Sequence, residues 1–298
     1  MALQRDTHYP GRWTTGNAAH PQGAFKNRTA PGALDGSFIE QDWANDWDGF
    51  FARLMTIAGM TANGTVDTAT ASQYYDALLA SIPGRLISSQ VVSATGTLNA
   101  PAGFAIARFR LSGGGGGSGV VVSTNASQVS AVGGGASGSY LEGWLTAAQF
   151  GASQTVTIGA AGAGGTAGSG GGTGGTSSVG TLLVAPGGLG SPASVVVSTT
   201  ATDVSVGGMP GAVATGGTEL NETGMQGDYG IALTSKTLGG KGGSNPMGSP
   251  GQAAGSTFTP TSGTGFGSGA GGWANGVSTV AKVGIDGRPG GLIVEWWG

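Results

Sequence analysis

Long runs of glycine constrain the fold of this chain more than any other feature of its sequence. Five consecutive glycines occupy 113–117, and further glycine-rich stretches cover 133–135, 159–175 and 239–243. These stretches are too long for tight turns, and glycine has no side chain that could contribute to an apolar core. Two interpretations fit them. The stretches are flexible loops, or they form a bundle of polyglycine II helices whose backbones approach closely and exchange N–H···O and Cα–H···O hydrogen bonds.

The overall composition predicts an ordered protein despite this glycine content. The 64 glycines and 12 prolines together form about a quarter of the 298 residues, a share close to that of low-complexity chains. However, 38% of the residues are hydrophobic and only 9% are charged. Disordered chains are typically poor in apolar residues and rich in net charge, so we expect this chain to fold.

Charge and cysteine content exclude several classes of function. The formal net charge is −3, from 12 basic and 15 acidic residues, and this balance offers no basic surface for nucleic acid or anionic membrane. The chain has no cysteine, which excludes disulfides, thiolate nucleophiles and cysteine metal sites. The first residues lack the apolar stretch of a secretory signal, and no run approaches the ~18 apolar residues of a membrane span. We expect a soluble protein without membrane insertion or a nucleic-acid partner.

The composition changes near residue 111 and indicates separate domains. Glycine accounts for 11 of the first 110 residues but for 53 of the remaining 188. Residues 1–36 contain scattered proline and glycine without a sustained period, which predicts an extended arm that becomes ordered on a partner surface. We therefore expect an arm over 1–36, a helical hairpin over 37–84 and a glycine-rich domain over 85–298.

The start of the hairpin region predicts an amphipathic helix. Ser37 and Glu40 have the spacing of a capping box, and Gly59 is a typical C-terminal stop. Between them, apolar side chains recur every three or four residues, which is the period of one helix face. These residues are Ile39, Trp43, Trp47, Phe50 or Phe51, Leu54 and Ile57.

A second, shorter helix is predicted after a turn at Asn63 and Gly64. Asp67 or Thr68 can cap it, and Pro83 ends it. Two short helices cannot bury all of their aromatic side chains against each other. We therefore expect a surface for contact with another subunit or a larger assembly, formed by Trp43, Trp47, Phe50, Phe51, Leu54, Tyr74 and Tyr75.

From residue 85 onward the hydrophobic period becomes two, which predicts short strands. Apolar residues alternate with polar ones over 105–111, and further β-rich runs cover 120–123, 155–158, 181–184, 194–197, 204–206 and 292–297. Short strands separated by glycine-rich loops are typical of a β-sandwich or a jelly-roll-like fold, so the predicted class is mainly β. Trp296 and Trp297 are adjacent on the last strand, so we expect one to face the core and the other an outer face.

The sequence contains few residues that could form a catalytic site. His8 and His20 both lie in the arm, which excludes a histidine-based triad or metal cluster in the glycine-rich domain. Glu219 and Glu222 are three residues apart, and paired carboxylates can cleave glycosides, but isolated surface acids are the preferred interpretation. We expect no catalytic residues, no metal and no cofactor.

Isolated aromatic and amide side chains remain as binding candidates. Tyr229 and Trp273 lie among small polar residues with almost no apolar neighbours, where either exposure or a structural role is open. Rigid rings among short polar side chains suit uncharged or sugar-like surfaces. We predict that a binding partner contacts the loops over 207–276 through Tyr229, Trp273, Asn245 and Asn275.

Several stretches of the chain resemble the glycine-rich tail fibers, or receptor-binding proteins, of tailed bacteriophages and prophages. The segments 27–38 and 58–60 around the tryptophan-rich helix look like the virion-attachment module of such fibers, and 65–78 resembles the short helix that follows it. The segments 155–162, 176–180, 265–272 and 287–297 are similar to their glycine-rich C-terminal domain. These domains also look like the glycine-rich module of some animal receptor kinases, a strand sandwich with inserted polyglycine helices.

The resemblance implies a homotrimer in the virion tail. Its N-terminus would dock on baseplate or tail-tip proteins, and its C-terminal domain would bind a bacterial surface receptor, either a polysaccharide or a surface protein. The leading hypothesis is thus a non-enzymatic adhesin. The alternatives are a polysaccharide depolymerase tail spike that uses the scarce carboxylates, and a purely structural glycine-rich protein.

Overall fold

The computed structural model describes residues 7, 10–14, 24–37, 41–82, 84–234, 236–255 and 258–298. The chain divides into two compact units, Met1–Pro83 (unit 1) and Gly84–Gly298 (unit 2), and this division lies next to the boundary expected from the sequence. The protein is mainly β. The expectations for His8, His20, Ile39, Glu40 and Pro83 concern positions outside the described residues.

The arm of unit 1 contains a pair of short strands. Strand β1 (Trp13–Thr14) pairs antiparallel with β2 (Ala24–Phe25), and the rings of Trp13 and Phe25 are 4.9 Å apart. The Ser37 hydroxyl accepts a hydrogen bond from the Lys26 N–H at 2.8 Å and donates one to the Arg12 carbonyl. Ser37 therefore joins the segments of the arm, and its expected role as a helix cap concerns backbone groups outside the described residues.

Two helices follow, as the sequence predicted. Helix α2 (Gln41–Ile57) ends before Gly59, which adopts the left-handed φ of 64° that a helix stop requires. Helix α3 (Gln73–Ser81) is capped by Ser72, whose hydroxyl accepts from the Tyr75 N–H at 3.1 Å. The cap expected at Asp67 or Thr68 is thus wrong by several residues.

The carboxylate of Asp67 nevertheless supports the start of α3. It accepts hydrogen bonds from the Ser72 hydroxyl at 2.6 Å and from the backbone N–H groups of Gln73 and Tyr74 at 3.1 and 3.2 Å. These bonds hold the pKa of Asp67 below its usual value, with the Ser72 bond as the largest cause. A small core of Leu54, Met55 and Ala77 joins the two helices.

One end of unit 2 is a sandwich of two antiparallel sheets. The first sheet has the order β13-β7-β5-β19-β3 and the second the order β10-β9-β8-β4. The strands of the first sheet are β13 (Leu220–Glu222), β7 (Tyr140–Thr146), β5 (Ile106–Ser112), β19 (Gly291–Trp297) and β3 (Leu86–Val92). Those of the second are β10 (Leu183–Ala185), β9 (Ser177–Val179), β8 (Ser153–Thr157) and β4 (Gly96–Asn99).

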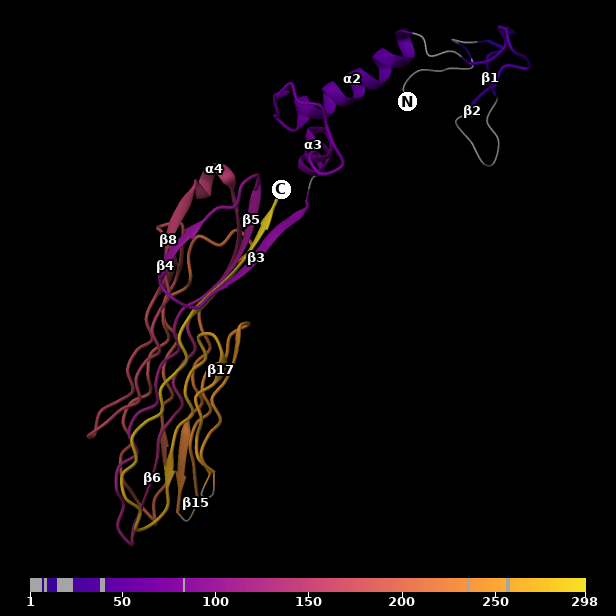
Figure 1. Cartoon of the computed structure of the whole chain (residues 1–298). Coiled ribbons are helices and arrows are strands. Elements are labelled where there is room, and N and C mark those ends of the chain that lie inside the picture. Colours follow the sequence, from indigo (N-terminus) through magenta and orange to yellow (C-terminus); the bar gives the residue numbers. More distant parts are fainter. Residues whose placement is uncertain are drawn as a thin grey trace. The chain divides into compact units, whose positions relative to one another are not determined.

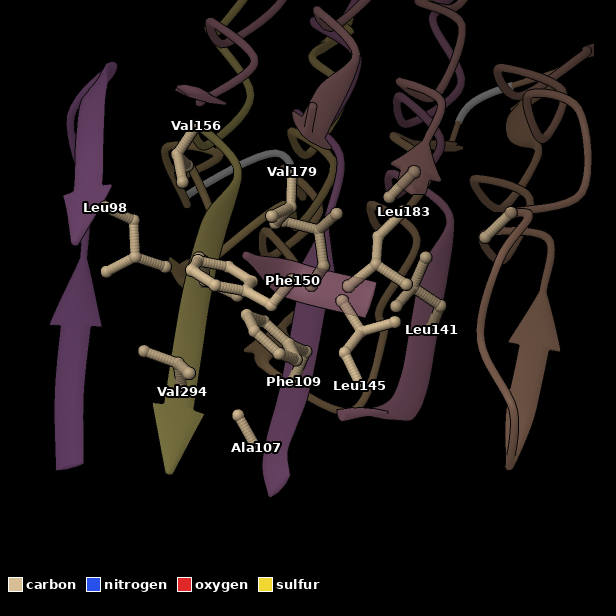
Figure 2. Close-up of a cluster of buried hydrophobic side chains, with 14 of the residues drawn as sticks. Leu98, Ala107, Phe109, Leu141, Leu145, Phe150, Val156, Val179, Leu183 and Val294 are labelled. Carbon is tan, nitrogen blue, oxygen red and sulfur yellow. The ribbon is translucent and has the colours of Figure 1, made fainter. Parts of the chain in front are cut away.

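The apolar core lies between these sheets (Figure 2). Alternate residues of β5 and β19 face it, because side chains on a strand point to opposite faces in turn. Trp296 is fully buried and Trp297 is partly exposed, which confirms that one tryptophan faces the core and the other an outer face. A short helix that the sequence did not reveal, α4 (Ala147–Phe150), places Phe150 against Phe109 and Trp296 with ring centroids 5.7 and 5.0 Å away.

The glycine-rich segments run from the sandwich as extended chains side by side (Figure 1). Segment 113–118 donates backbone hydrogen bonds with a three-residue repeat. Gly113 and Gly116 donate to the carbonyls of Ser139 and Ala136, respectively. Gly114 and Gly117 donate in the same way to Gly175 and Gly172. Gly115 and Ser118 donate to Arg288 and Ile285. Its carbonyl groups accept from three other segments, at Gly162 and Gly165, at Gly188 and Ser191, and at Ala270.

Six neighbouring segments therefore surround 113–118, three as acceptors and three as donors. The residues of 113–118 and of 129–141 are all buried, although they carry mostly glycine, serine and alanine. This part of the molecule is held by backbone hydrogen bonds and not by apolar side chains. The strand expected over 120–123 is wrong, because Val120 and Val121 donate to Ser169 and Lys282 as part of the bundle, and of 194–197 only Val197 lies in a strand.

Two small sheets close the far end of the bundle. One has the order β11-β6-β18 with β11 (Val197–Ser198), β6 (Gln128–Ala131) and β18 (Ala274–Asn275). The other has the order β12-β14-β15 with β12 (Asp203–Ser205), β14 (Gly230–Leu233) and β15 (Lys236–Leu238). A two-stranded pair, β16 (Gly248–Ser249) and β17 (Thr264–Gly265), lies along the side of the bundle.

The ends of unit 2 lie together at the sandwich. Gly84 N–H donates to the Gly298 carbonyl at 2.9 Å, and Gly298 N–H donates to the Arg85 carbonyl at 2.9 Å. Strands β6 and β15 lie at the opposite end of the unit, named the distal end below (Figure 1). The distal end is thus separated from the point where the chain enters unit 2 by the whole bundle.

Candidate functional site

A sheet at the distal end presents an apolar face to solvent. In the sheet β12-β14-β15, Val204 lies opposite Ile231, and Ile231 lies opposite Leu238. Val204 is 55% exposed and Leu238 is 51% exposed, so this row of aliphatic side chains is not covered. We name this surface the distal face; it comprises Val204, Val206, Tyr229, Ile231, Leu233 and Leu238.

The opposite side of the same sheet explains why these side chains point outward. Ala232 is 3% exposed and packs with Val129, Ala131 and Ala274 of the neighbouring sheet. Because side chains alternate along a strand, burying Ala232 turns Ile231 and Leu233 to the outside. Large β-branched and aliphatic residues at such exposed positions commonly mark an interaction surface when they are contiguous.

Of the four residues predicted to contact a receptor, Tyr229 lies in this surface. It directly precedes β14, two residues before Ile231, and is 51% exposed. Sequence reasoning missed the aliphatic members of the distal face. Their signal was the alternation of Ile231 and Leu233 with smaller residues, which is weak because each strand has only three or four residues.

Trp273 lies close to the distal end but is half-buried. It precedes β18, and its carbonyl accepts a hydrogen bond from the Val132 N–H at 2.9 Å. The ammonium group of Lys282 lies 4.5 Å from the centre of its ring, a typical cation–π distance. Lys282 therefore covers one face of the Trp273 ring.

The structure contradicts the expectation that Asn275 contacts a receptor. Asn275 is fully buried, and its amide nitrogen donates to the carbonyls of Val122 and Val280 at 2.8 and 2.9 Å. Its function in this position is to join the segment that precedes Thr124 to the turn that precedes Lys282. An amide is well suited to this role because it can donate two hydrogen bonds from one nitrogen.

Asn245 lies elsewhere, beside the sandwich. Its amide nitrogen donates to the Ser112 hydroxyl at 2.8 Å, and its oxygen accepts from the Met247 N–H at 2.8 Å. Asn245 lines two adjoining hollows of about 460 and 350 Å³, which also share Ser244 and Pro246. The structure thus does not bring the four predicted residues together into one site.

The outer face of the five-stranded sheet carries a network of charged and aromatic side chains. Arg108 contacts Glu142 at 2.6 Å and Glu219 at 3.6 Å, and Arg110 contacts Glu295 at 2.9 Å. Trp144 donates from its indole nitrogen to Glu219 at 2.7 Å, and the Tyr140 hydroxyl donates to Glu142. These pairs connect neighbouring strands, so the network stabilises the sheet.

The protonation of this network suits a structural role. The hydrogen bond from Tyr140, and then Arg108, hold the pKa of Glu142 below its usual value, whereas burial raises the pKa of Tyr140. The general acid of a glycosidase needs the opposite shift, a carboxyl group whose pKa is raised. Glu219 does not form the carboxylate pair with Glu222 that was considered from the sequence, since it contacts Arg108 and Trp144.

The aromatic residues expected to form an attachment surface occupy unit 1. A series of ring contacts connects Trp43, Trp47, Phe51 and Tyr74, with centroid distances of 6.2, 5.9 and 4.5 Å. Leu54 is buried against α3, but Phe50 and Tyr75 are 56% and 60% exposed. The two helices thus leave a large part of their aromatic surface uncovered.

In the part of the chain that the structure describes, no three His, Asp or Glu side chains are arranged to hold a metal ion. No helix among these residues is both long enough and apolar enough to cross a membrane. No protein-family model matches the chain, and no curated protein sequence matches it. The interpretation of the site therefore depends on its own geometry and chemistry.

Proposed function

We propose that this protein is a receptor-binding tail fiber of a bacteriophage or prophage, located in the virion tail. Unit 1 attaches to baseplate or tail-tip proteins, and the distal end of unit 2 adsorbs to the bacterial surface without catalysis. The observation that carries this proposal is the exposed distal face, located at the opposite end of unit 2 from Gly84, where the chain enters. An adhesin needs this separation, because its receptor site must point away from its attachment.

We further propose that the glycine-rich segments are a bundle of polyglycine II helices. The three-residue repeat of their hydrogen bonds and the six neighbours of segment 113–118 support this assignment, since polyglycine II has three residues per turn. Such a bundle provides a rigid support for the distal face. A receptor site that is already ordered loses less conformational entropy on binding.

We also propose that the protein is a homotrimer, as the resemblance to tail fibers implies. The uncovered aromatic side chains of unit 1 support self-association, because a stable monomer rarely leaves so many of them exposed. Closed symmetry is the common arrangement of identical subunits. Light scattering at micromolar concentration measures the state directly, and a stable monomer would exclude the trimer.

The chemistry of the distal face favours a surface protein as the receptor. Val204, Ile231 and Leu238 are aliphatic, and such side chains lose contact with water most effectively against another apolar surface. Sugars are recognised mainly by aromatic rings and polar side chains, and here one ring face of Trp273 is already covered by Lys282. We therefore expect adsorption to decrease when bacterial cells are treated with protease, and to persist on cells with truncated surface polysaccharide.

The decisive experiment compares two matched double variants in adsorption to a panel of bacterial strains. Val204→Ser with Leu238→Ser removes apolar groups from the distal face, and we expect adsorption to fall by about tenfold or more. Val91→Ser with Leu86→Ser changes the same residue types at exposed positions of β3 and should adsorb normally. Equal adsorption of the two variants would refute the assignment of the distal face, and shortening of purified polysaccharide by the protein would indicate the depolymerase instead.

A further inference from the structure

Helix α2 carries the heptad pattern of a coiled coil. Its apolar residues are spaced alternately by four and three positions, which corresponds to a repeat of 3.5 residues. In heptad notation they occupy alternating d and a positions. These residues form the helical seam, which comprises Trp43, Trp47, Phe50, Leu54 and Ile57.

Much of the helical seam is uncovered within unit 1. Phe50 and Ile57 are 56% and 57% exposed, and Trp47 is 39% exposed. Helix α3 covers only the flank of α2 that carries Met55, together with Leu54 at the edge of the seam. Unit 1 therefore leaves the d positions at Phe50 and Ile57 available to another helix.

The partner of a heptad seam must itself be a helix of comparable length and period. Helix α2 has 17 residues, whereas α3 has nine and α4 has four, so α2 is the only helix in the described part of the chain that spans two heptads. The partner that this chain can supply is thus α2 of another copy. Leu54 is already buried against α3 within unit 1, so the seam positions open to this partner are Trp47, Phe50 and Ile57.

We propose that α2 helices of three copies pack in parallel along their helical seams and form the trimer interface of this protein. The inference names the interface of the trimer proposed above and therefore rests on that assembly. Cyclic symmetry of three subunits requires the helices to run parallel around the axis. Asp46 and Arg53 occupy g positions beside the seam, where charged side chains commonly border the buried core of a coiled coil.

Self-association also explains how α2 is stable with the sequence it has. Gly49 lies in the middle of the helix, where glycine is less favourable than alanine because it loses more backbone freedom. Helix α2 shares only a small core with α3. Packing of the seam between copies would supply the remaining tertiary stabilisation that a helix of this length needs.

The test uses the absence of cysteine, which makes single cysteine variants of the full chain unambiguous. Phe50→Cys and Ile57→Cys place thiols at d positions, and Ala52→Cys places one at an exposed position on the opposite side of α2. Under mild oxidation, we expect covalent dimers from both d variants, formed about tenfold or more faster than from Ala52→Cys, because thiols in one assembly meet at high effective concentration.

The results of cross-linking and light scattering together distinguish a wrong interface from a wrong oligomeric state. Cross-links in both the Phe50→Cys and the Ile57→Cys variant support parallel packing, whereas cross-links in the Phe50→Cys variant alone would indicate antiparallel helices and overturn the proposal. A trimer in light scattering without cross-links in either variant would leave the trimer intact and refute this interface. A monomer would refute both.

A second pair of variants tests the interface without cysteine chemistry. Phe50→Ser with Ile57→Ser changes two exposed positions of the seam, and we expect the trimer to dissociate into monomers whose unit 2, with its own core, remains folded. Tyr75→Ser with Leu78→Ser changes two exposed positions of α3 and should leave the trimer intact. Dissociation of the α3 variant alone would assign the interface to α3 and overturn the proposal.

Discussion

Single glycine residues in the bundle are fixed by close neighbours and not by their own φ angles. A β-carbon on Gly116 would overlap the carbonyl group of Leu189, and one on Gly135 would overlap the carbonyl of Gly116. In a segment at the outside of the bundle, every third residue points into the bundle and the two residues between point outward. In one such segment the buried glycines are Gly224, Gly227 and Gly230, whereas Met225 and Tyr229 are exposed. Two residues in three are thus free to determine the chemistry of the surface.

Substitution of a central glycine should therefore be severely destabilising. We expect Gly116→Ala to lower the free energy of unfolding by more than about 3 kcal/mol, because the backbone of a neighbouring segment must move to accommodate the methyl group. Gly96→Ala is the matched control, since a β-carbon there meets no atom within 4 Å, and its effect should stay within about 0.5 kcal/mol. Urea unfolding of both variants measures the difference, and equal midpoints would contradict the close packing.

The ionised state of Glu142 predicts how stability depends on pH. Its pKa is lowered in the folded protein, so the stabilisation it provides is present above the unfolded pKa of about 4.3 and is lost as the pH falls through the lower folded value. We expect melting temperatures to fall between about pH 5 and pH 3. Glu142→Gln should be less stable by about 1 kcal/mol at pH 7 and should show a smaller fall on acidification.

The control for this prediction is Glu222→Gln, an exposed acid on the neighbouring strand β13. Its melting temperature should follow the wild-type protein over the same pH range. If Glu142→Gln retained the full acid dependence, the network around Arg108 would not be its source.

At the scale of elements, strands with two distinct faces could be predicted from the sequence. The alternation over 105–111 and 292–297 identified β5 and β19, because one side of each faces a core. The run at 120–123 has the same valine-rich composition but lies in the bundle, where hydrogen bonds come from distant segments. Composition alone cannot distinguish these two environments. A Gly-x-x-Gly repeat, as at 224–230 and 284–290, was the available signal for the bundle.

The candidate site was predictable only in part, for the same reason. Exposure of Tyr229 follows from its local sequence, where glycines occupy the buried positions. Burial of Asn275 does not, because it depends on Val122, which lies more than 150 residues earlier in the chain. Residues that are covered by distant segments cannot be identified from their immediate neighbours.

Helix α4 shows how much one short element can contribute to the core. Phe150 is fully buried and stacks on Phe109. We expect Phe150→Ala to lower the free energy of unfolding by about 3 to 5 kcal/mol, through loss of apolar contact and formation of a cavity. Phe258→Ala is a matched control at a 73% exposed position and should change it by less than about 0.5 kcal/mol. Chemical denaturation followed by tryptophan fluorescence measures both, and a small effect at Phe150 would contradict the packing described for α4.

At the scale of the whole molecule, the two units are built on different principles. Unit 1 has a small apolar core and a large exposed aromatic surface, whereas unit 2 has a complete sandwich core and a buried backbone lattice. Unit 2 also joins its own ends through the hydrogen bonds between Gly84, Arg85 and Gly298. Assembly and receptor contact can therefore be separated experimentally by cutting the chain between the units.

We expect residues 84–298, produced alone, to form a folded monomer that binds the receptor weakly. The cut exposes none of the sandwich core, so thermal unfolding of this fragment should match that of unit 2 in the full chain. Without α2 the fragment lacks the proposed trimer interface and keeps a single distal face. Dissociation from immobilised bacterial surfaces should be faster than for the full chain by about a hundredfold, because three linked sites rebind at high effective concentration.

The full-length Phe50→Ser, Ile57→Ser variant should dissociate as fast as the fragment, since both are monomers with an intact distal face. A trimeric fragment would instead assign the assembly to unit 2, and slow dissociation of a monomeric fragment would show that avidity does not determine adsorption.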